Sequence, residues 1–241
     1  MSHRVKRMSL FALAFAALLA VVGATFMGKA SAQDTTPTPG VLGTPAATDE
    51  CGTADATTTP TVTPAAIFEI ASDESEARYR AQEELANIGA NEAVGATNAF
   101  IGQILFDDQG WPIACSRFDV DLRTLTSDES RRDNFLYTNT LETQTYPLAT
   151  FVLTSVEGWD DEDAQGEGTE VRLIGNLTVH GETKLIAWDA TITMDGDTFT
   201  GAAATTFNMA DFNITSPTVG PVTSIDETIT LEVDIMAKKA E

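Results

Sequence analysis

One region, Val120–Phe151, does most to constrain the fold, because it combines strand-like alternation with a single short, charged helix. Phe118, Val120 and Leu122 alternate with charged residues, which is typical of a strand with one buried face. The region therefore begins as a half-buried strand.

A helix signal follows this strand. Thr126 and Glu129 have the spacing of a capping box, with Thr126 as the N-cap. This predicts a charged helix over Glu129–Thr140, and the chain re-enters a strand after Pro147. A strand, a short helix and a strand in this order would cross the open end of a β-barrel or sandwich.

Alternating strands separated by turns continue from Ile67 to the end of the chain, with spacings that are typical of an all-β barrel. About eight strands are expected, which is enough for a closed antiparallel barrel that is either filled by side chains or holds one ligand. Alternation predicts an apolar lining of Val94, Phe100, Ile104, Phe106, Phe118, Val120, Phe151, Leu153, Leu177, Trp188, Phe199 and Phe207.

The chain is predicted to have three parts. Residues 1–32 read as an export signal, with basic residues before an apolar run and Ala30-Ser31-Ala32 at the cleavage position. Without cleavage, the same run would anchor the protein in a membrane. Residues 33–66, rich in Thr, Pro and Ala, are expected to be a disordered linker. The barrel is expected over 67–239. An exported protein would be periplasmic or extracellular.

The charge of the chain excludes one class of partner. Its formal net charge is −22, and cleavage after Ala32 would remove four basic residues and no acidic residue, giving −26. Such a polyanion is repelled by nucleic acid and by anionic membrane surfaces. Nucleic-acid binding is therefore not expected, and membrane attachment is expected only through an uncleaved signal or the linker.

Two cysteines, Cys51 and Cys115, are present. Export would permit a disulfide between them, and the even number fits one. The alternative is two unpaired thiols, one on the linker and one packed as a small apolar side chain.

The sequence gives no strong signal for catalysis or for a metal. Outside the signal, His180 is the one histidine, and it falls in a hairpin turn beside Gly181. The chain has no G-x-S-x-G elbow, and Asp160–Asp163 lacks the spaced ligands of a calcium loop. No catalytic or metal-binding residue and no cofactor are predicted.

Two basic residues of the helix are candidate ligand contacts. Arg131 and Arg132 could recognise a headgroup at the mouth of the barrel, or they could be surface charges of a helix that plugs it. Plugging is the preferred interpretation, because Phe135, Leu136 and Leu141 offer apolar contacts.

Three phrases of the sequence resemble the YceI-like family of exported, lipocalin-like lipid-binding proteins. They are Asp121–Phe151, with its DLRTL, SDESRRDNFL and YPLATF segments, the hairpin GNLTVHGETK at Gly175–Lys184, and ADFNI at Ala210–Ile214. The sequence departs from the family pattern in Ser72–Glu76, near Met209, and at Asn213. These departures remove polar groups that could hold a headgroup.

The resemblance implies a protein that holds a long amphiphile in its barrel: a polyisoprenoid, an isoprenoid quinone or a fatty-acid derivative. Burial of the apolar chain would provide the affinity. Two alternatives are a filled barrel that binds another envelope protein and an enzyme acting on a lipid. The sequence contains no feature that favours the enzyme.

Overall fold

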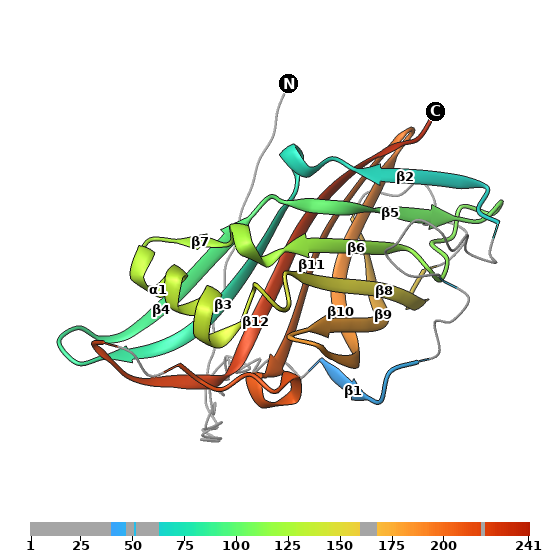
Figure 1. Ribbon diagram of the computed structural model, residues 1–241. Helices are drawn as coiled ribbons and strands as arrows, with labels where there is room; N and C mark the ends of the chain where they lie inside the picture. Colours follow the sequence, from blue (N-terminus) through green and yellow to red (C-terminus); the bar gives the residue numbers. More distant parts are fainter. Residues whose placement is uncertain (1–39, 47–50, 52–62, 160–167, 218–219) are drawn as a thin grey trace, which may run out of the picture. The chain divides into compact units, whose positions relative to one another are not determined.

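The structure, a computed structural model, describes residues 40–46, 51, 63–159, 168–217 and 220–241, which lie within one compact unit, Thr36–Glu241 (Figure 1). Its strands are β1 (Val41–Gly43), β2 (Ala66–Ile70), β3 (Glu76–Leu85), β4 (Gly89–Thr97), β5 (Phe100–Phe106), β6 (Arg117–Asp121), β7 (Thr126–Ser127), β8 (Leu148–Glu157), β9 (Thr169–Val179), β10 (Glu182–Asp195), β11 (Thr198–Asn208) and β12 (Val222–Lys239).

One short α-helix, α1, occurs among the described residues. It is followed directly by a π-helical turn, and three 3₁₀ turns connect strands elsewhere. The segments are η2 (Ser72–Glu74), η3 (Leu122–Thr124), α1 (Ser130–Phe135), the π-helical turn η4 (Leu136–Thr140) and η6 (Met209–Phe212).

Eight antiparallel strands close into a ring, in the order β10-β9-β8-β6-β5-β2-β12-β11 and back to β10. Closure leaves no unpaired edge within the ring. The prediction of an eight-stranded antiparallel barrel with one short helix is confirmed.

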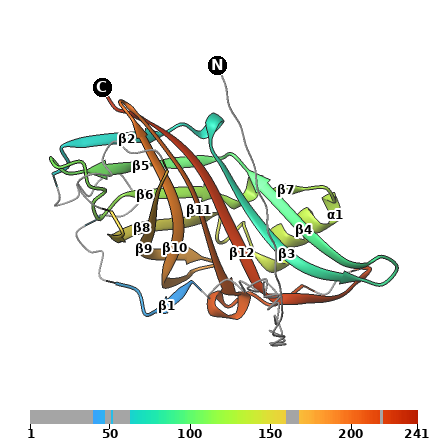
Figure 2. The ribbon, with the colours of Figure 1, turned by 180° about the vertical axis from the view of Figure 1, so that it is seen from behind.

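One wall of the barrel continues beyond the ring. The end of β12 pairs with β2, whereas its longer first part, from Val222 to Asp234, pairs with β3. The strands β4 and β7 then follow β3 in the same sheet. Figures 1 and 2 show this β3–β4 extension on the side of the molecule where α1 lies. The helix therefore packs near one end of the barrel.

The interior contains two apolar clusters. The first centres on Phe151, Trp188 and Phe212, and the second on Phe106, Phe199 and Trp159. Alternation explains this arrangement, because one side chain in two along each strand points inward. On β10, for example, Ile186, Trp188, Ala190 and Ile192 are all buried.

The helix begins later than predicted. Its N-cap is Glu129, whose carboxylate accepts a hydrogen bond from the backbone N–H of Arg131. Thr126 instead pairs with Ala96 in β7. The predicted capping box at Thr126 is therefore wrong, because the strand β7 competes for those residues.

The predicted inward direction of Val94 is also wrong. On β4 the buried residues are Ala93, Gly95 and Thr97, so Val94 lies on the opposite face and is partly exposed. The residues from Val94 to Phe106 belong to two strands, β4 and β5. The break at Asn98–Ala99 shifts the alternation by one residue.

Parts of the predicted linker are ordered on the barrel, and we call Gly40–Ala46 together with Cys51 the N-terminal strap. Its strand β1 pairs with β10, and Gly40 joins β11 to β10 through backbone hydrogen bonds with Thr206 and Ala187. Here backbone pairing stabilises a segment whose side chains are small. The prediction of disorder over 33–66 therefore does not hold for the strap.

Three sequence predictions lie outside the described residues: the export signal over 1–32, most of the linker, and the acidic segment of 160–167. Among the helices of the described ranges, none has the length and apolar character needed to cross a membrane.

Candidate functional site

A partly enclosed cavity of about 70 Å³ lies between the two apolar clusters, inside the barrel. Every strand of the ring except β2 contributes to its wall. The wall consists of Gln103, Ile104, Pro112, Ser116, Arg117, Phe118, Phe151, Leu153, Leu173, Trp188, Ala190, Ile192, Phe199, Gly201, Ala203, Val233 and Ile235.

Aromatic rings fill most of the barrel beside this cavity. The ring centroids of Phe118 and Phe151 are 5.4 Å apart, and Trp188 lies 6.0 Å from Phe151 in an edge-to-face arrangement. Phe100 extends the group, 5.9 Å from Phe118. We call these four residues the aromatic cluster. Edge-to-face and offset contacts of this kind are the favoured geometries of aromatic pairs.

Two glycines make room for the aromatic cluster. A Cβ at Gly102 would come within 2.9 Å of the Phe118 Cβ, and a Cβ at Gly175 would come within 2.5 Å of the Phe151 ring. Because these two positions carry no side chain, Phe118 and Phe151 can pack directly against the backbone of the neighbouring strands.

The polar side chains of the wall are mostly engaged with protein partners. Ser116 Oγ accepts a hydrogen bond from the Leu105 N–H at 2.9 Å and donates to the Ile113 carbonyl at 2.9 Å. The Arg117 guanidinium is paired with Asp119, with N···O distances of 2.9 and 3.0 Å. Trp188 differs, because its buried indole N–H has no hydrogen-bond partner among the described residues.

The predicted lining residues divide into groups. Six of them line the cavity: Ile104, Phe118, Phe151, Leu153, Trp188 and Phe199. Five are buried in the apolar clusters but are not part of the cavity wall: Phe100, Phe106, Val120, Leu177 and Phe207. Val94 lies outside both the clusters and the wall.

Other wall residues were missed by sequence reasoning. Leu173, Val233 and Ile235 follow the same alternation as the predicted residues, so that signal could have identified them. Pro112 lies in the loop between β5 and β6 and forms an isolated bridge with Phe106. No periodicity marks such a loop residue.

Arg132 anchors the helix α1 to the extended wall. Its guanidinium lies 3.2 Å from Glu83 and 2.7 Å from Asp128, and Glu83 is buried. Glu83 also accepts a hydrogen bond from Asn91 at 2.8 Å. The side chain of Arg131 is exposed. Of the two predicted headgroup contacts, Arg132 therefore already forms ion pairs with protein carboxylates, whereas Arg131 is exposed.

Tyr79, whose hydroxyl is buried although the residue is partly exposed, lies beside this ion pair. The Tyr79 ring covers Gly95, and its hydroxyl has no hydrogen-bond partner among the described residues. Burial raises the pKa of Tyr79 to about 12. A neutral hydroxyl is therefore maintained next to Arg132 and Glu83.

His180 lies in a turn outside the cavity wall. It occupies the β9–β10 turn with a positive φ of 51°. Its ring packs edge-to-face against Tyr146 at 4.9 Å, and its Nδ1 lies 3.3 Å from the Phe212 carbonyl oxygen. It is not part of the cavity wall. In the described part of the chain, no group of three His, Cys, Asp or Glu side chains converges as a metal site would require.

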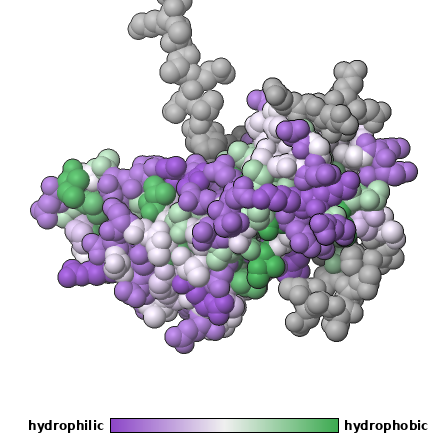
Figure 3. Space-filling model, turned by 90° about the horizontal axis from the view of Figure 1, so that it is seen from above, coloured by the Kyte–Doolittle hydropathy of each residue, from purple (hydrophilic) through white to green (hydrophobic). Residues whose placement is uncertain are grey.

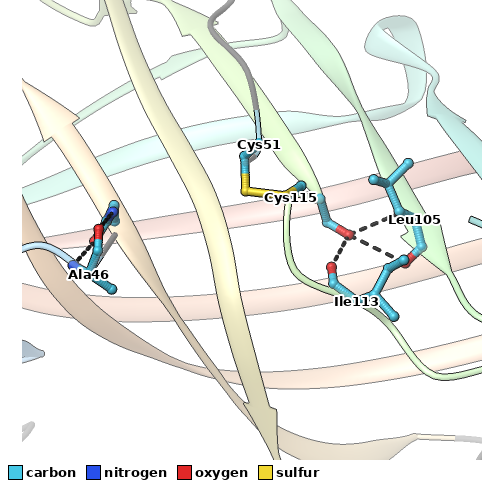
Figure 4. Close-up of a disulfide and its surroundings, with 7 residues drawn as sticks. Ala46, Cys51, Leu105, Ile113 and Cys115 are labelled. Atoms are coloured by element: carbon cyan, nitrogen blue, oxygen red, sulfur yellow. Dashed lines mark hydrogen bonds between the residues drawn. A yellow bond between two sulfur atoms is a disulfide. The ribbon is translucent and has the colours of Figure 1, made fainter. Parts of the chain in front are cut away.

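The strap is held at its far end by a disulfide between Cys51 and Cys115, whose Cα atoms are 4.8 Å apart (Figure 4). Cys115 directly precedes the wall residue Ser116. Closer to β1, both amide atoms of the buried Asn176 bind the backbone of Ala46, at 2.9 and 2.8 Å. The strap is therefore attached at β10, β9 and the loop before β6.

The described surface carries few large apolar side chains. Ile88 and Ile101 are the most exposed, followed by Leu42 and Leu148. Figure 3 shows small hydrophobic areas separated by hydrophilic surface on the face that it displays. Single exposed apolar residues of this kind are common on protein surfaces.

The sequence is similar to a family profile and to several known proteins. A YceI-like domain profile matches residues 68–237. A UPF0312 protein of Pseudomonas putida is 36% identical over 111 residues, which cover 42% of this chain and 54% of the relative. The chain thus spans about half the length of that relative. Protein YceI of Salmonella arizonae is 27% identical over 150 residues, covering 59% of this chain and 74% of the relative.

Two solved structures share the fold. BcnA of Burkholderia cenocepacia has a TM-score of 0.55 at 16% identity, covering 70% of this chain and 99% of that chain. A polyisoprenoid binding domain from Saccharophagus degradans also has a TM-score of 0.55, at 12% identity, covering 72% of this chain and 98% of that chain. The profile match covers more than half of the sequence, and the chain belongs to the YceI-like domain family.

Proposed function

We propose that this protein is an exported carrier that holds a long amphiphilic lipid inside its barrel. The ligand classes are a polyisoprenoid, an isoprenoid quinone or a fatty-acid derivative. The observation that carries the proposal is the apolar cavity between the two clusters, whose wall contains residues from every strand of the ring except β2. The Saccharophagus degradans structure, named as a polyisoprenoid binding domain, supports the same ligand class.

The size of the cavity requires the aromatic cluster to move when a lipid enters. A volume of about 70 Å³ is well below the ~300–1,000 Å³ of ordinary ligand pockets. Burying ten methylene groups would contribute about 8 kcal/mol before ordering costs. Each aromatic pair that separates would cost about 0.5–1.5 kcal/mol. This gain exceeds the loss of the ring–ring contacts that Phe118 and Phe151 would give up.

Binding is proposed in preference to catalysis. The wall combines apolar side chains with a few polar groups, and Ser116 and Arg117 are engaged with protein partners. His180 lies in a turn outside it. A reaction on a lipid would need an acid, base or nucleophile facing the bound chain.

Export is proposed from two observations. Residues 1–32 have the order of a signal sequence, and the Cys51–Cys115 bond fits an oxidising compartment such as the periplasm or the extracellular space. Expression with its own N-terminus followed by mass spectrometry tests this. Cleavage after Ala32 is expected, and an intact N-terminus on a protein that stays inside the cell would contradict export.

The ligand proposal is tested by extracting the purified protein with organic solvent and analysing the extract by mass spectrometry. A stoichiometric lipid with a chain of ten carbons or more is expected. Uptake of a tritiated isoprenoid alcohol by the delipidated protein is the second measurement. A protein without extractable lipid that also fails to take up the isoprenoid would contradict the proposal.

A second candidate function is a tethered module with a filled barrel that binds an envelope protein. The small volume of the cavity favours it. An apolar fluorescent probe separates the two candidates, because a filled barrel would leave the probe in water with unchanged emission. A saturable increase in probe emission would favour the lipid carrier.

A further inference from the structure

Two buried tryptophans carry indole N–H groups without hydrogen-bond partners among the described residues: Trp159 and Trp188. Both side chains are at least nine-tenths buried. Buried donors are normally paired, so an unpaired one requires an explanation. The two indoles differ in whether they line the cavity.

Trp188 forms part of the cavity wall, whereas Trp159 does not. Trp188 lies on β10 opposite Leu173, with the rings of Phe118 and Phe151 at its sides. The rings are steeply inclined to the indole, by 72° and 76°. These rings offer the indole N–H no oxygen or nitrogen acceptor, and the donor has no partner among the described residues. A ligand oxygen would therefore accept a hydrogen bond from this donor.

The charge of the wall determines which oxygen fits. The basic side chain of the wall, Arg117, is already paired with Asp119. A carboxylate or phosphate placed in the cavity would be a buried charge without a counter-ion, which is strongly unfavourable. A neutral carbonyl accepts one hydrogen bond and carries no such penalty.

We propose that the Trp188 indole N–H donates to a neutral carbonyl oxygen of the bound amphiphile, within the barrel. This rests on the proposed lipid-carrier function and narrows the ligand to a long chain that bears a ketone, ester or quinone carbonyl. A charged headgroup, where the ligand has one, stays outside the cavity. Trp188 is thus a specificity-determining residue, and the carbonyl distinguishes the ligand from a plain hydrocarbon.

The test compares a long-chain ketone with the alkane of equal chain length. The full ¹⁵N-labelled protein is titrated with each, and the indole N–H resonances are assigned with the W188F and W159F variants. Both compounds move the Trp188 resonance as the neighbouring rings are displaced, and the ketone is expected to move it further downfield than the alkane, because only the ketone accepts a hydrogen bond from the indole N–H. The Trp159 resonance should respond to neither. This readout uses the unsubstituted protein, so it does not depend on how the variants fold.

Affinities provide the second readout. W188F also removes part of the cavity wall and so changes the binding of both compounds, but it should lower the ratio of ketone affinity to alkane affinity about tenfold, which corresponds to the loss of one hydrogen bond in an apolar site. W159F should change neither. Equal effects of W188F on ketone and alkane, or a downfield shift at Trp159 in place of Trp188, would overturn the inference while leaving the carrier function intact. If neither compound binds the unsubstituted protein, the carrier function itself fails.

Discussion

The ring of Phe151 occupies the space that a side chain at Gly175 would need. The two residues lie on the adjacent strands β8 and β9, and a Cβ at Gly175 would lie 2.5 Å from the Phe151 Cζ. It would also collide with the Val152 carbonyl oxygen, which belongs to the backbone and cannot turn away. The glycine is therefore a requirement of the aromatic cluster.

Gly175→Ala is expected to destabilise the protein by about 2–3 kcal/mol, because the added methyl group overpacks a position bounded by backbone. Gly201→Ala is the matched control. A Cβ there would meet the movable Phe199 ring at 3.3 Å, so the cost should stay below about 1 kcal/mol. Urea unfolding measures both. Equal costs at the two positions would contradict this account of the barrel wall.

Arg132→Ala is expected to destabilise the protein by about 2 kcal/mol, because it leaves the buried Glu83 without its cation. This is less than the roughly 3–5 kcal/mol of a fully buried pair, since Arg132 is partly exposed. Arg131→Ala, its exposed neighbour, should change stability by less than about 0.5 kcal/mol. Thermal unfolding compares them. A larger loss in the Arg131 variant would reverse the assignment of the helix anchor.

Tyr79→Phe should alter the response of stability to high pH. Burial raises the pKa of Tyr79 from 10 to about 12, so its contribution to stability is fully present below pH 10 and is lost as the pH rises toward 12. The variant lacks this loss, so its unfolding free energy should decline less steeply above pH 10.

At neutral pH the same substitution removes a hydroxyl that has no hydrogen-bond partner in the described part of the chain, and the effect should be neutral or stabilising. Tyr137→Phe is the control, because the Tyr137 hydroxyl donates to the Leu125 carbonyl and its removal should cost about 1 kcal/mol. If the unfolding free energy of wild type and of the Tyr79 variant depends on pH in the same way, the Tyr79 hydroxyl is not buried.

The strap should contribute to stability through the disulfide and Asn176 together. Reduction of the Cys51–Cys115 bond, which spans 64 residues, is expected to cost about 3–4 kcal/mol. Asn176→Ala should cost about 2 kcal/mol in the oxidised protein and less after reduction, because both hold the same segment. Urea unfolding with and without reductant gives the four values. Strict additivity would mean that the two attachments act independently.

Much of the barrel could be predicted from alternation, because inward and outward side chains repeat with a period of two. The prediction of inward side chains from alternation is wrong where the alternation shifts by one residue between two strands. At Asn98–Ala99 the break between β4 and β5 places Val94 on the face opposite to the predicted one. A local sequence pattern does not reveal such shifts, since they depend on the partner strand.

The strap and the cavity depended on contacts that no local pattern contains. Asn176 and Ala46 are 130 positions apart, and neither residue type indicates that a linker is held there. The aromatic residues Phe118, Phe151 and Trp188 were identified from the sequence, but their mutual packing over glycines sets the cavity volume. That packing is a property of the closed ring.

The most direct test of the carrier function fills the cavity from one strand. Ala203 on β11 lines the cavity, and its neighbour Ala202 is exposed on the outer face. Binding of tritiated geranylgeraniol is measured for wild type, A203F and A202F, each checked for folding by circular dichroism. We predict equal affinity for wild type and A202F and at least tenfold weaker binding for A203F. Undiminished binding by a folded A203F, or no binding by wild type, would contradict a ligand site inside the barrel.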